Sequence, residues 1–249
     1  MGSMLLLIAI GLAVGVFVIS LGGGGGAIYL GVLTAIFQLP PASAAATSIV
    51  TALPALILGS ISYYRKRLIN FHLGNRMMIA AIPSIFVGYL ISPLIPTKIY
   101  KLIIGIILIL LGLQIFYKLY HNAPTKDDET SAKTASIGYG ILGGLMVGIA
   151  GLSGGGPITA GLLVLGASMA EASATSAYVL VGMSIVGALL HLAGGTVDWN
   201  AAIGLIVGSL GGSLLAPPVI IWLANRLQRA FYIKLFMGVF IILMGIKTL

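Results

Sequence analysis

Five consecutive glycines, Gly22-Gly23-Gly24-Gly25-Gly26, interrupt the first long apolar stretch of the chain, and Gly154-Gly155-Gly156-Pro157 interrupts another in the second half. Each glycine inside a helix costs about 1 kcal/mol relative to alanine, so five in a row oppose a continuous helix by roughly 4–5 kcal/mol. A break inside a membrane is tolerated only where protein or trapped water meets the freed backbone groups. The two glycine runs therefore predict two broken helices, and the remaining segments are expected to surround them.

The composition is that of a membrane protein. Hydrophobic residues make up 59% and charged residues 7% of the 249 residues, and the mean hydropathy is +1.14. Soluble domains carry about a quarter charged residues, and apolar runs of about 20 residues span a bilayer core. We therefore expect an all-α, polytopic helical membrane protein. Residues 1–3 are interpreted as an addition before a native start at Met4, and no cleavable signal peptide is expected.

Several classes of function are disfavoured by what the sequence lacks. The chain has no cysteine, which excludes disulfides, Cys-ligated metals and thiol nucleophiles. It also has no HExxH and no Walker-type GxxxxGK motif, so neither an enzyme nor a metal site is expected, and no cofactor. The net charge of +8 comes from short basic groups between apolar spans. That distribution is typical of cytoplasmic loops and not of a nucleic-acid surface.

Ten apolar segments follow one another, with approximate bounds 4–21, 26–38, 42–64, 74–95, 98–120, 136–152, 157–169, 172–194, 199–222 and 229–249. The second and seventh reach only about 20 Å as helices, less than the bilayer core of about 30 Å. If all ten cross, ten of the 13 Lys and Arg fall on one face, whereas eight crossings split them eight to five. The positive-inside rule favours ten, with both termini outside; eight crossings with two re-entrant segments remain the alternative.

The chain divides into two related halves, 4–120 and 136–249, joined by a polar stretch, 121–135, that is expected to be a cytoplasmic linker. A shift of 130 residues aligns the two glycine runs, places Ala42-Ser43-Ala44 on Ala172-Ser173-Ala174, and places Asn70 on Asn200. Five crossings in each half is an odd number, so the sequence predicts two inverted repeats of about five helices each. Repeats of this kind frame the substrate site in transporters.

The broken helices are candidates for an anion site. A helix that starts inside the membrane presents unpaired N–H groups and about half a positive charge, and glycine lets a ligand approach the backbone. Small polar residues follow each run, and their hydroxyls could complete the coordination of an oxyanion; Thr51 and Ser184 end these two stretches. Close helix packing is the alternative role for each hydroxyl. The substrate-binding candidates are Gly23, Gly24, Gly25, Gly26, Ser43, Thr47, Ser48, Ser153, Gly154, Gly155, Gly156, Ser173, Thr175 and Ser176.

Three ionisable residues are candidates for proton coupling: Glu171, His191 and Asp198. Glu171 is an intramembrane carboxylate only if the end of the seventh segment near Ala170 stops inside the membrane. The sequence leaves open whether that end or the glycine end lies deeper. His191 is a packing residue or a proton site, and Asp198 is a helix-start residue or a proton site.

An intramembrane protease is the alternative from another class. Gly151-Leu152-Ser153-Gly154 resembles the GxSG motif of rhomboid proteases, and His191 could supply the base. Both motifs are short, and the first glycine run has no serine at the matching position, Gly23. The protease interpretation therefore leaves half of the repeated pattern unexplained.

The order of these features resembles the TauE/SafE family of sulfite exporter-like permeases. The resemblance rests on the Gly-rich break after the first helix, the Ala-Ser-Ala start of the next long helix, Val197-Asp198-Trp199, and the duplication around a polar linker. It implies a secondary transporter that moves sulfite or organosulfonate anions across the cytoplasmic membrane by alternating access between two repeats. The direction that the resemblance implies is export. A passive anion channel is the nearest alternative. The lipid bilayer and the anion are the expected partners, and a homo-oligomer is left open.

Overall fold

The computed structural model describes residues 2–21, 37–91, 129–150, 153–194 and 197–224, and a few residues outside these ranges: 29, 32–33, 96, 102, 106, 109–110, 113, 116–117, 231–232, 235, 239, 242–243 and 246. The first glycine run and the apolar segments 98–120 and 229–249 lie outside these five ranges. Their predicted roles as a break and as crossings therefore stay predictions.

All the regular structure in these ranges is α-helical, as the composition predicted. The helices are α1 (Gly2–Leu21), α3 (Pro41–Arg65), α4 (Phe71–Ile91), α6 (Glu129–Ala150), α7 (Gly155–Val164), α8 (Met169–Gly194) and α9 (Trp199–Ala224). Within the described part of the chain, α3, α4, α8 and α9 contain four stretches long and apolar enough to cross a membrane. The bounds of these four helices agree with the sequence segments to within four residues, whereas α7 is a short helix of 10 residues.

Helix α6 begins earlier than the sequence pattern indicated. Its first residue is Glu129, inside the stretch 121–135 that was expected to be a linker. An acidic residue in a first turn is stabilised by the positive end of the helix dipole, and residues such as Ala132 and Lys133 favour helix. Residues 129–135 of this polar stretch therefore belong to a helix that starts before the apolar segment.

Two helix pairs have the most extensive contacts, α1 with α9 and α4 with α6. Glycine makes both approaches close: a Cβ at Gly208 of α9 would overlap the Ile8 carbonyl oxygen of α1, and one at Gly148 of α6 would overlap the Ile85 carbonyl oxygen of α4. Small residues at four-residue spacing are a known way for membrane helices to pack backbone against backbone. Each half of the chain thus contributes one helix to each pair.

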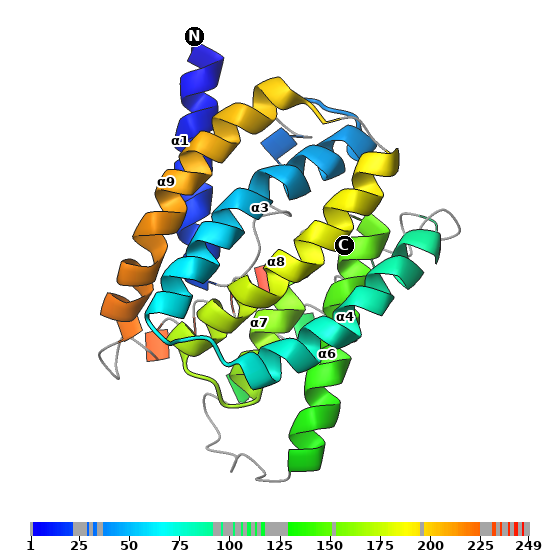
Figure 1. Cartoon of the computed structure of the whole chain (residues 1–249), viewed down its shortest axis with the longest axis vertical. Helices are drawn as coiled ribbons and strands as arrows, with labels where there is room; N and C mark the ends of the chain where they lie inside the picture. The colour runs from blue at the N-terminus through cyan, green and yellow to red at the C-terminus, as the bar shows by residue number, and fades with distance from the viewer. Residues whose placement is uncertain are drawn as a thin grey trace.

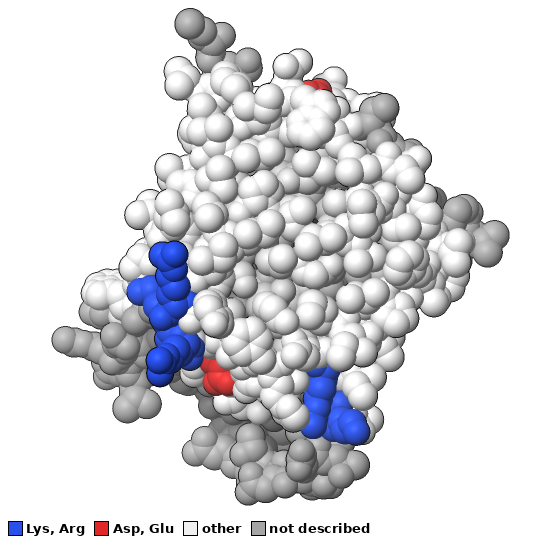
Figure 2. Space-filling view, in the orientation of Figure 1, with Lys and Arg blue, Asp and Glu red and all other residues white. Residues whose placement is uncertain are grey.

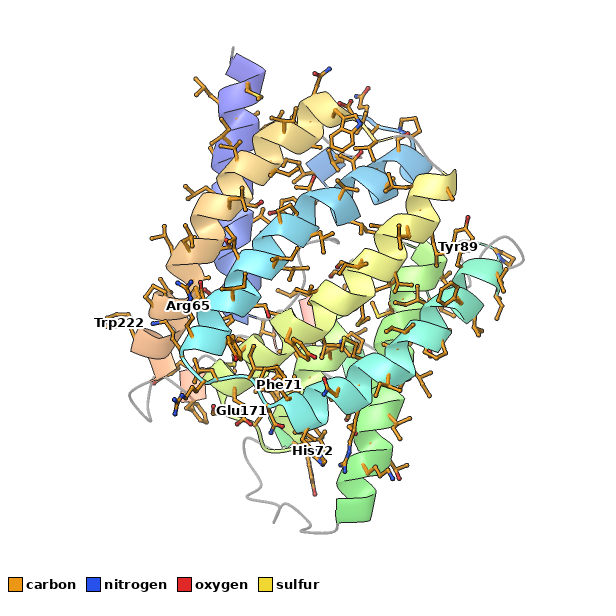
Figure 3. All side chains as sticks on the ribbon, viewed as in Figure 1. Arg65, Phe71, His72, Tyr89, Glu171 and Trp222 are labelled. Atoms are coloured by element: carbon orange, nitrogen blue, oxygen red, sulfur yellow. The ribbon has the colours of Figure 1, made fainter. Side chains whose placement is uncertain are left out.

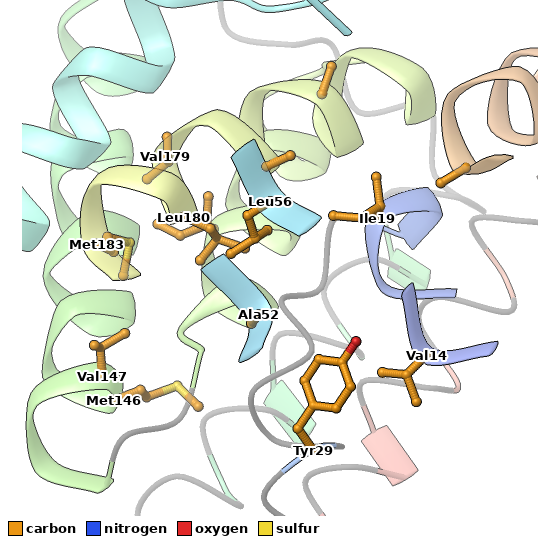
Figure 4. Close-up of a cluster of buried hydrophobic side chains, with 14 of the residues drawn as sticks. Val14, Ile19, Tyr29, Ala52, Leu56, Met146, Val147, Val179, Leu180 and Met183 are labelled. Atoms are coloured by element: carbon orange, nitrogen blue, oxygen red, sulfur yellow. The ribbon is translucent and has the colours of Figure 1, made fainter. Parts of the chain in front are cut away.

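Helices α3 and α8 lie at the centre and run in opposite directions (Figure 1). Helix α3 packs against α9, and α8 packs against α4. Leu56 of α3 joins Leu180 and Met183 of α8 in one buried cluster, to which Met146 of α6 also belongs (Figure 4). The centre of the molecule is therefore a contact between the two halves of the chain.

The two ends of the molecule differ in charge. Every Lys and Arg of the five described ranges lies toward the lower end in Figure 2, where α3 ends and α4 and α6 begin: Arg65, Lys66, Arg67, Arg76 and Lys133. Helix α1 begins at the opposite end (Figure 1). Basic residues collect on the cytoplasmic side of membrane proteins. This charge asymmetry is therefore an indicator of how the protein is oriented in the membrane.

Candidate functional site

Helix α7 starts in the interior of the bundle. Its N-cap, Gly154, is buried and has a left-handed φ of 59°. A Cβ on Gly154 would lie against the Gly143 carbonyl oxygen of α6 and 2.8 Å from Cε of Met183, which is in the middle of α8. Because a left-handed φ costs other residues about 1–2 kcal/mol and this position has no room, only glycine suits it. The predicted break at Gly154 is thus a helix start enclosed by protein.

The first turn of α7 carries the backbone donors of a helix start. No side chain caps it, and the backbone contact from the Ile158 N–H to the Gly154 carbonyl is long, at 3.5 Å. Pro157 has no N–H, so the donors of the first turn belong to Gly155 and Gly156. Unpaired N–H groups at a helix start attract anions. The structure thus has a helix start where the glycine pattern predicted a break, and anion binding there stays a prediction.

The other end of α7 reaches an end of the bundle. Ser168 accepts the Glu171 backbone N–H only weakly through its Oγ, at 3.2 Å, at the start of α8. The half-buried Glu171 accepts a hydrogen bond of 2.9 Å from Nδ2 of Asn70, and Figure 3 places Glu171 near Phe71 and His72 at the basic end. The glycine end of α7 therefore lies closer to the centre of the bundle than the end near Glu171.

Two hydrogen bonds tie the halves together at the starts of α4 and α9, and we call them the cap ties. The Asn70 N–H donates to Oγ1 of Thr175 on α8 at 2.9 Å, and the Asp198 N–H donates to Oγ1 of Thr47 on α3 at 3.0 Å. Each cap residue then receives the backbone N–H three residues later, from Leu73 at 3.1 Å and from Ala201 at 3.0 Å. The two sets are equivalent atom for atom.

The cap ties revise the alignment of the halves. They relate Asn70 to Asp198 and Thr47 to Thr175, an offset of 128 residues, whereas the sequence shift of 130 related Asn70 to Asn200. At 128, the tripeptide Ala46-Thr47-Ser48 falls on Ala174-Thr175-Ser176. This repeated Ala-Thr-Ser is the signal that would have identified the two cap residues. The Ala-Ser-Ala match misses it by two positions because glycine, alanine and serine recur throughout.

The remaining hydroxyl candidates also have partners. Ser173 donates to the Ser20 carbonyl at 2.6 Å, and Thr159 of α7 donates to Oγ of Ser176 at 2.9 Å. Ser43, Ser48 and Ser153 have interaction partners as well. Ser173 and Ser176 thus take part in contacts between helices, a packing role alongside the predicted binding role.

Two buried hydroxyls differ from all the others described. Oγ1 of Thr51 on α3 and the Tyr29 hydroxyl have no hydrogen-bond partner, although the two residues are 0% and 1% exposed. Tyr29 lies beside Ser209 of α9, and Ser209 gives its own proton to the Ile206 carbonyl. A buried unpaired donor costs about 1–3 kcal/mol. The sequence analysis included Thr51 in a polar stretch and missed Tyr29.

The proton-coupling candidates do not form one cluster. Glu171 lies in the first turn of α8, and His191 lies 20 residues along the same helix, about 30 Å away. Nε2 of His191 lies 3.2 Å from the Val147 carbonyl oxygen, and Asp198 is the cap of α9. Among the described residues no three His, Cys, Asp or Glu are placed to hold a metal ion.

Comparison with known proteins finds similarity to membrane transporters. The chain is 24% identical over 271 residues to the probable membrane transporter protein YunE of Bacillus subtilis (strain 168), covering 99% of this chain and 97% of that protein. Two further probable membrane transporter proteins of the same organism, YdhB and YjnA, are 24% and 26% identical over 84% of this chain and 87% of each. Residues 7–248 match the family model described as sulfite exporter TauE/SafE. The chain therefore belongs to the TauE/SafE family of membrane transporters.

Proposed function

We propose that this transporter exports small sulfur-containing anions, such as sulfite or organosulfonates, by alternating access between two inverted repeats in the cytoplasmic membrane. The substrate class follows the family description. What the chain's own residues add is a mechanism by which two halves could hold a site and expose it to either side in turn.

The cap ties are the observation that carries this mechanism. Each joins the start of a long helix in one half to a central helix of the other half. The related helices also run oppositely in Figure 1: α1 descends while α6 rises, α3 descends while α8 rises, and α4 rises while α9 descends. These pairs support an inverted duplication. In transporters built this way, one repeat rocks against the other around a central site.

The anion specificity rests on neutral donors. The described Lys and Arg side chains lie toward one end of the bundle, whereas the start of α7 is buried at its centre. An oxyanion there would meet the N–H groups of Gly155 and Gly156 and nearby hydroxyls. A site without a fixed positive charge also releases its ligand readily, which suits transport. We propose the first-half run, Gly23–Gly26, as the counterpart of this helix start.

The charge asymmetry supports an orientation. If the basic end with Arg65 and Lys133 faces the cytoplasm, the start of α1 faces outside. This agrees with the predicted external N-terminus. Coupling to protons through Glu171, His191 or Asp198 is part of the same proposal, with Glu171 acting apart from His191 because they lie about 30 Å apart along α8.

Flux in proteoliposomes tests the proposal. Purified protein is reconstituted, and sulfite, taurine and sulfoacetate uptake is followed with and without a pH difference across the membrane. Accumulation above the external concentration under the pH difference is expected for a proton-coupled transporter. Equilibration without accumulation under every gradient would instead indicate a passive anion channel. If none of the anions moves, the substrate assignment is wrong.

A further inference from the structure

The Thr51 and Tyr29 hydroxyls are the two buried side-chain groups without a partner in the described part of the chain. Other buried hydroxyls of the same kind are satisfied: Tyr63 donates to the Ile19 carbonyl at 3.0 Å, and Thr159 donates to Ser176 at 2.9 Å. The protein can therefore pair a buried tyrosine or threonine hydroxyl where it only needs to be packed. Thr51 and Tyr29 are exceptions that call for a partner from outside the chain.

Both residues belong to the same side of the bundle. Thr51 lies one helical turn after Thr47 on α3, and residues four apart share a helix face. Thr47 contacts the start of α9, and α3 packs along α9. Tyr29 faces Ser209 in the middle of α9. Thr51 thus lies on the face of α3 that turns toward α9. Tyr29 lies beside α9 at Ser209, where α9 also packs against Gly15 of α1.

The available chemistry is hydrogen-bond donation to an anion. A hydroxyl can donate one proton and can also accept a hydrogen bond. Ser209 does not donate to Tyr29, because its proton is already bonded to the Ile206 carbonyl. A neutral donor that meets a charged oxygen makes a shorter and stronger bond than one that meets a neutral acceptor. A sulfur oxyanion offers two or more such oxygens, whereas an apolar or cationic solute offers none.

We infer that the Tyr29 and Thr51 hydroxyls donate hydrogen bonds to the oxygen atoms of the transported sulfur oxyanion. This inference rests on the proposed function and adds two substrate contacts in the first half of the chain. It also explains why the protein keeps two unpaired donors: their partner is the ligand, and stability is given up for binding.

The test compares thermal unfolding of purified full-length variants with and without sodium sulfite, with sodium chloride at equal ionic strength as the control. Tyr29→Phe and Thr51→Val each remove one unpaired hydroxyl and keep the shape of the side chain. We expect the sulfite dissociation constant to rise roughly 10- to 100-fold in each, because a hydrogen bond to a charged group is lost. Thr51→Ser keeps the hydroxyl and is expected to restore binding.

The unfolding midpoint of the ligand-free variants distinguishes this role from a packing role. Tyr29→Phe and Thr51→Val are expected to leave it unchanged or raised, because no native hydrogen bond is lost. Tyr63→Phe is the matched control: it removes a paired hydroxyl, so the midpoint should fall while sulfite affinity stays within about threefold.

Two results overturn the inference alone. One is unchanged sulfite affinity in both Tyr29→Phe and Thr51→Val, and the other is a fall of their ligand-free midpoints as large as that of Tyr63→Phe. If the wild-type protein is stabilised by neither sulfite nor a sulfonate such as taurine, the proposed function fails and the inference fails with it. The wild-type arm therefore separates the two failures.

Discussion

The central helices α3 and α8 are built alike and then diverge. Each carries Ala-Thr-Ser near its start, and the threonine of each, Thr47 or Thr175, accepts a backbone N–H from the other half. One turn later, α3 has Thr51 with an unpaired hydroxyl, whereas the equivalent position of α8 is the buried Val179. Threonine and valine have nearly the same shape, so packing does not require the difference.

This comparison separates two kinds of buried polar residue. Polar groups present in both halves are paired and hold the halves together. Thr51, which has no polar equivalent on α8, is unpaired, and its position does not depend on its hydroxyl for shape. Between α3 and α8, the position that departs from the shared pattern is therefore the one that we propose to contact the substrate.

The largest effect is expected on the α8 side, from Gly154→Val. Valine there must adopt the left-handed φ of 59° and overlap the Gly143 backbone and Met183. Backbone strain and overpacking together are expected to cost about 2–5 kcal/mol of unfolding free energy. The measurement is the unfolding free energy of the purified protein in detergent or bicelles.

Gly138→Val provides the matched control for this prediction. Gly138 lies on α6, and a Cβ added there would have nothing within 4 Å, so the same substitution meets no neighbour. It should cost well under 1 kcal/mol, since surface changes away from special features usually fall within about 0.5 kcal/mol. Equal stability of the two variants would show that the start of α7 is not seated against α6 and α8.

The next largest loss of unfolding free energy is expected when a cap tie is removed by Thr47→Val or Thr175→Val. Each change leaves the backbone N–H of Asp198 or Asn70 without its partner, which is expected to cost about 1–3 kcal/mol. Because the ties are equivalent, the two losses should agree within about 1 kcal/mol. Unfolding free energies of the single and double variants check this.

The double variant should lose the sum of the two single losses, because the ties lie at separate ends of the bundle and share no partner. If one tie costs nothing to remove while the other costs about 2 kcal/mol, the halves are not equivalent at these positions. That result would break the comparison on which the inverted arrangement rests.

The sequence predicted where helices and helix breaks lie, but it did not predict which buried hydroxyls have hydrogen-bond partners. Apolar runs and the Gly154–Gly156 break follow from hydropathy and helix propensity, and the structure has helices and a helix start there. Thr47 and Thr51, by contrast, are identical in chemistry and one turn apart. Only the residues that lie opposite them make one a structural acceptor and leave the other unpaired. Those opposing residues come from distant parts of the chain, which local sequence patterns do not reveal.

A smaller effect is expected when α8 is given the hydroxyl that α3 has. Val179→Thr adds a buried hydroxyl to a position where the side chain is 0% exposed. We expect a loss of about 1–2 kcal/mol of unfolding free energy and no gain in sulfite affinity, because this side already pairs its hydroxyls within the protein. A rise in stability would mean that the position holds an acceptor, and Val179 would then not be the apolar equivalent of Thr51.

The smallest expected effect concerns the ends of the same two helices. After α3, Arg67 has a left-handed φ of 55°, while the equivalent position in the sequence after α8 is Gly195. Arg67→Gly should raise the unfolding free energy by about 1 kcal/mol, because glycine adopts this conformation without the Cβ clash. Lys66→Gly removes the same charge at a residue with φ of −90° and should give no gain. If both substitutions change the unfolding free energy equally, the effect comes from the lost charge and not from the backbone conformation of Arg67. Arg65, Arg76 and one remaining basic residue of the turn still mark the cytoplasmic side, so membrane orientation should stay the same in either variant.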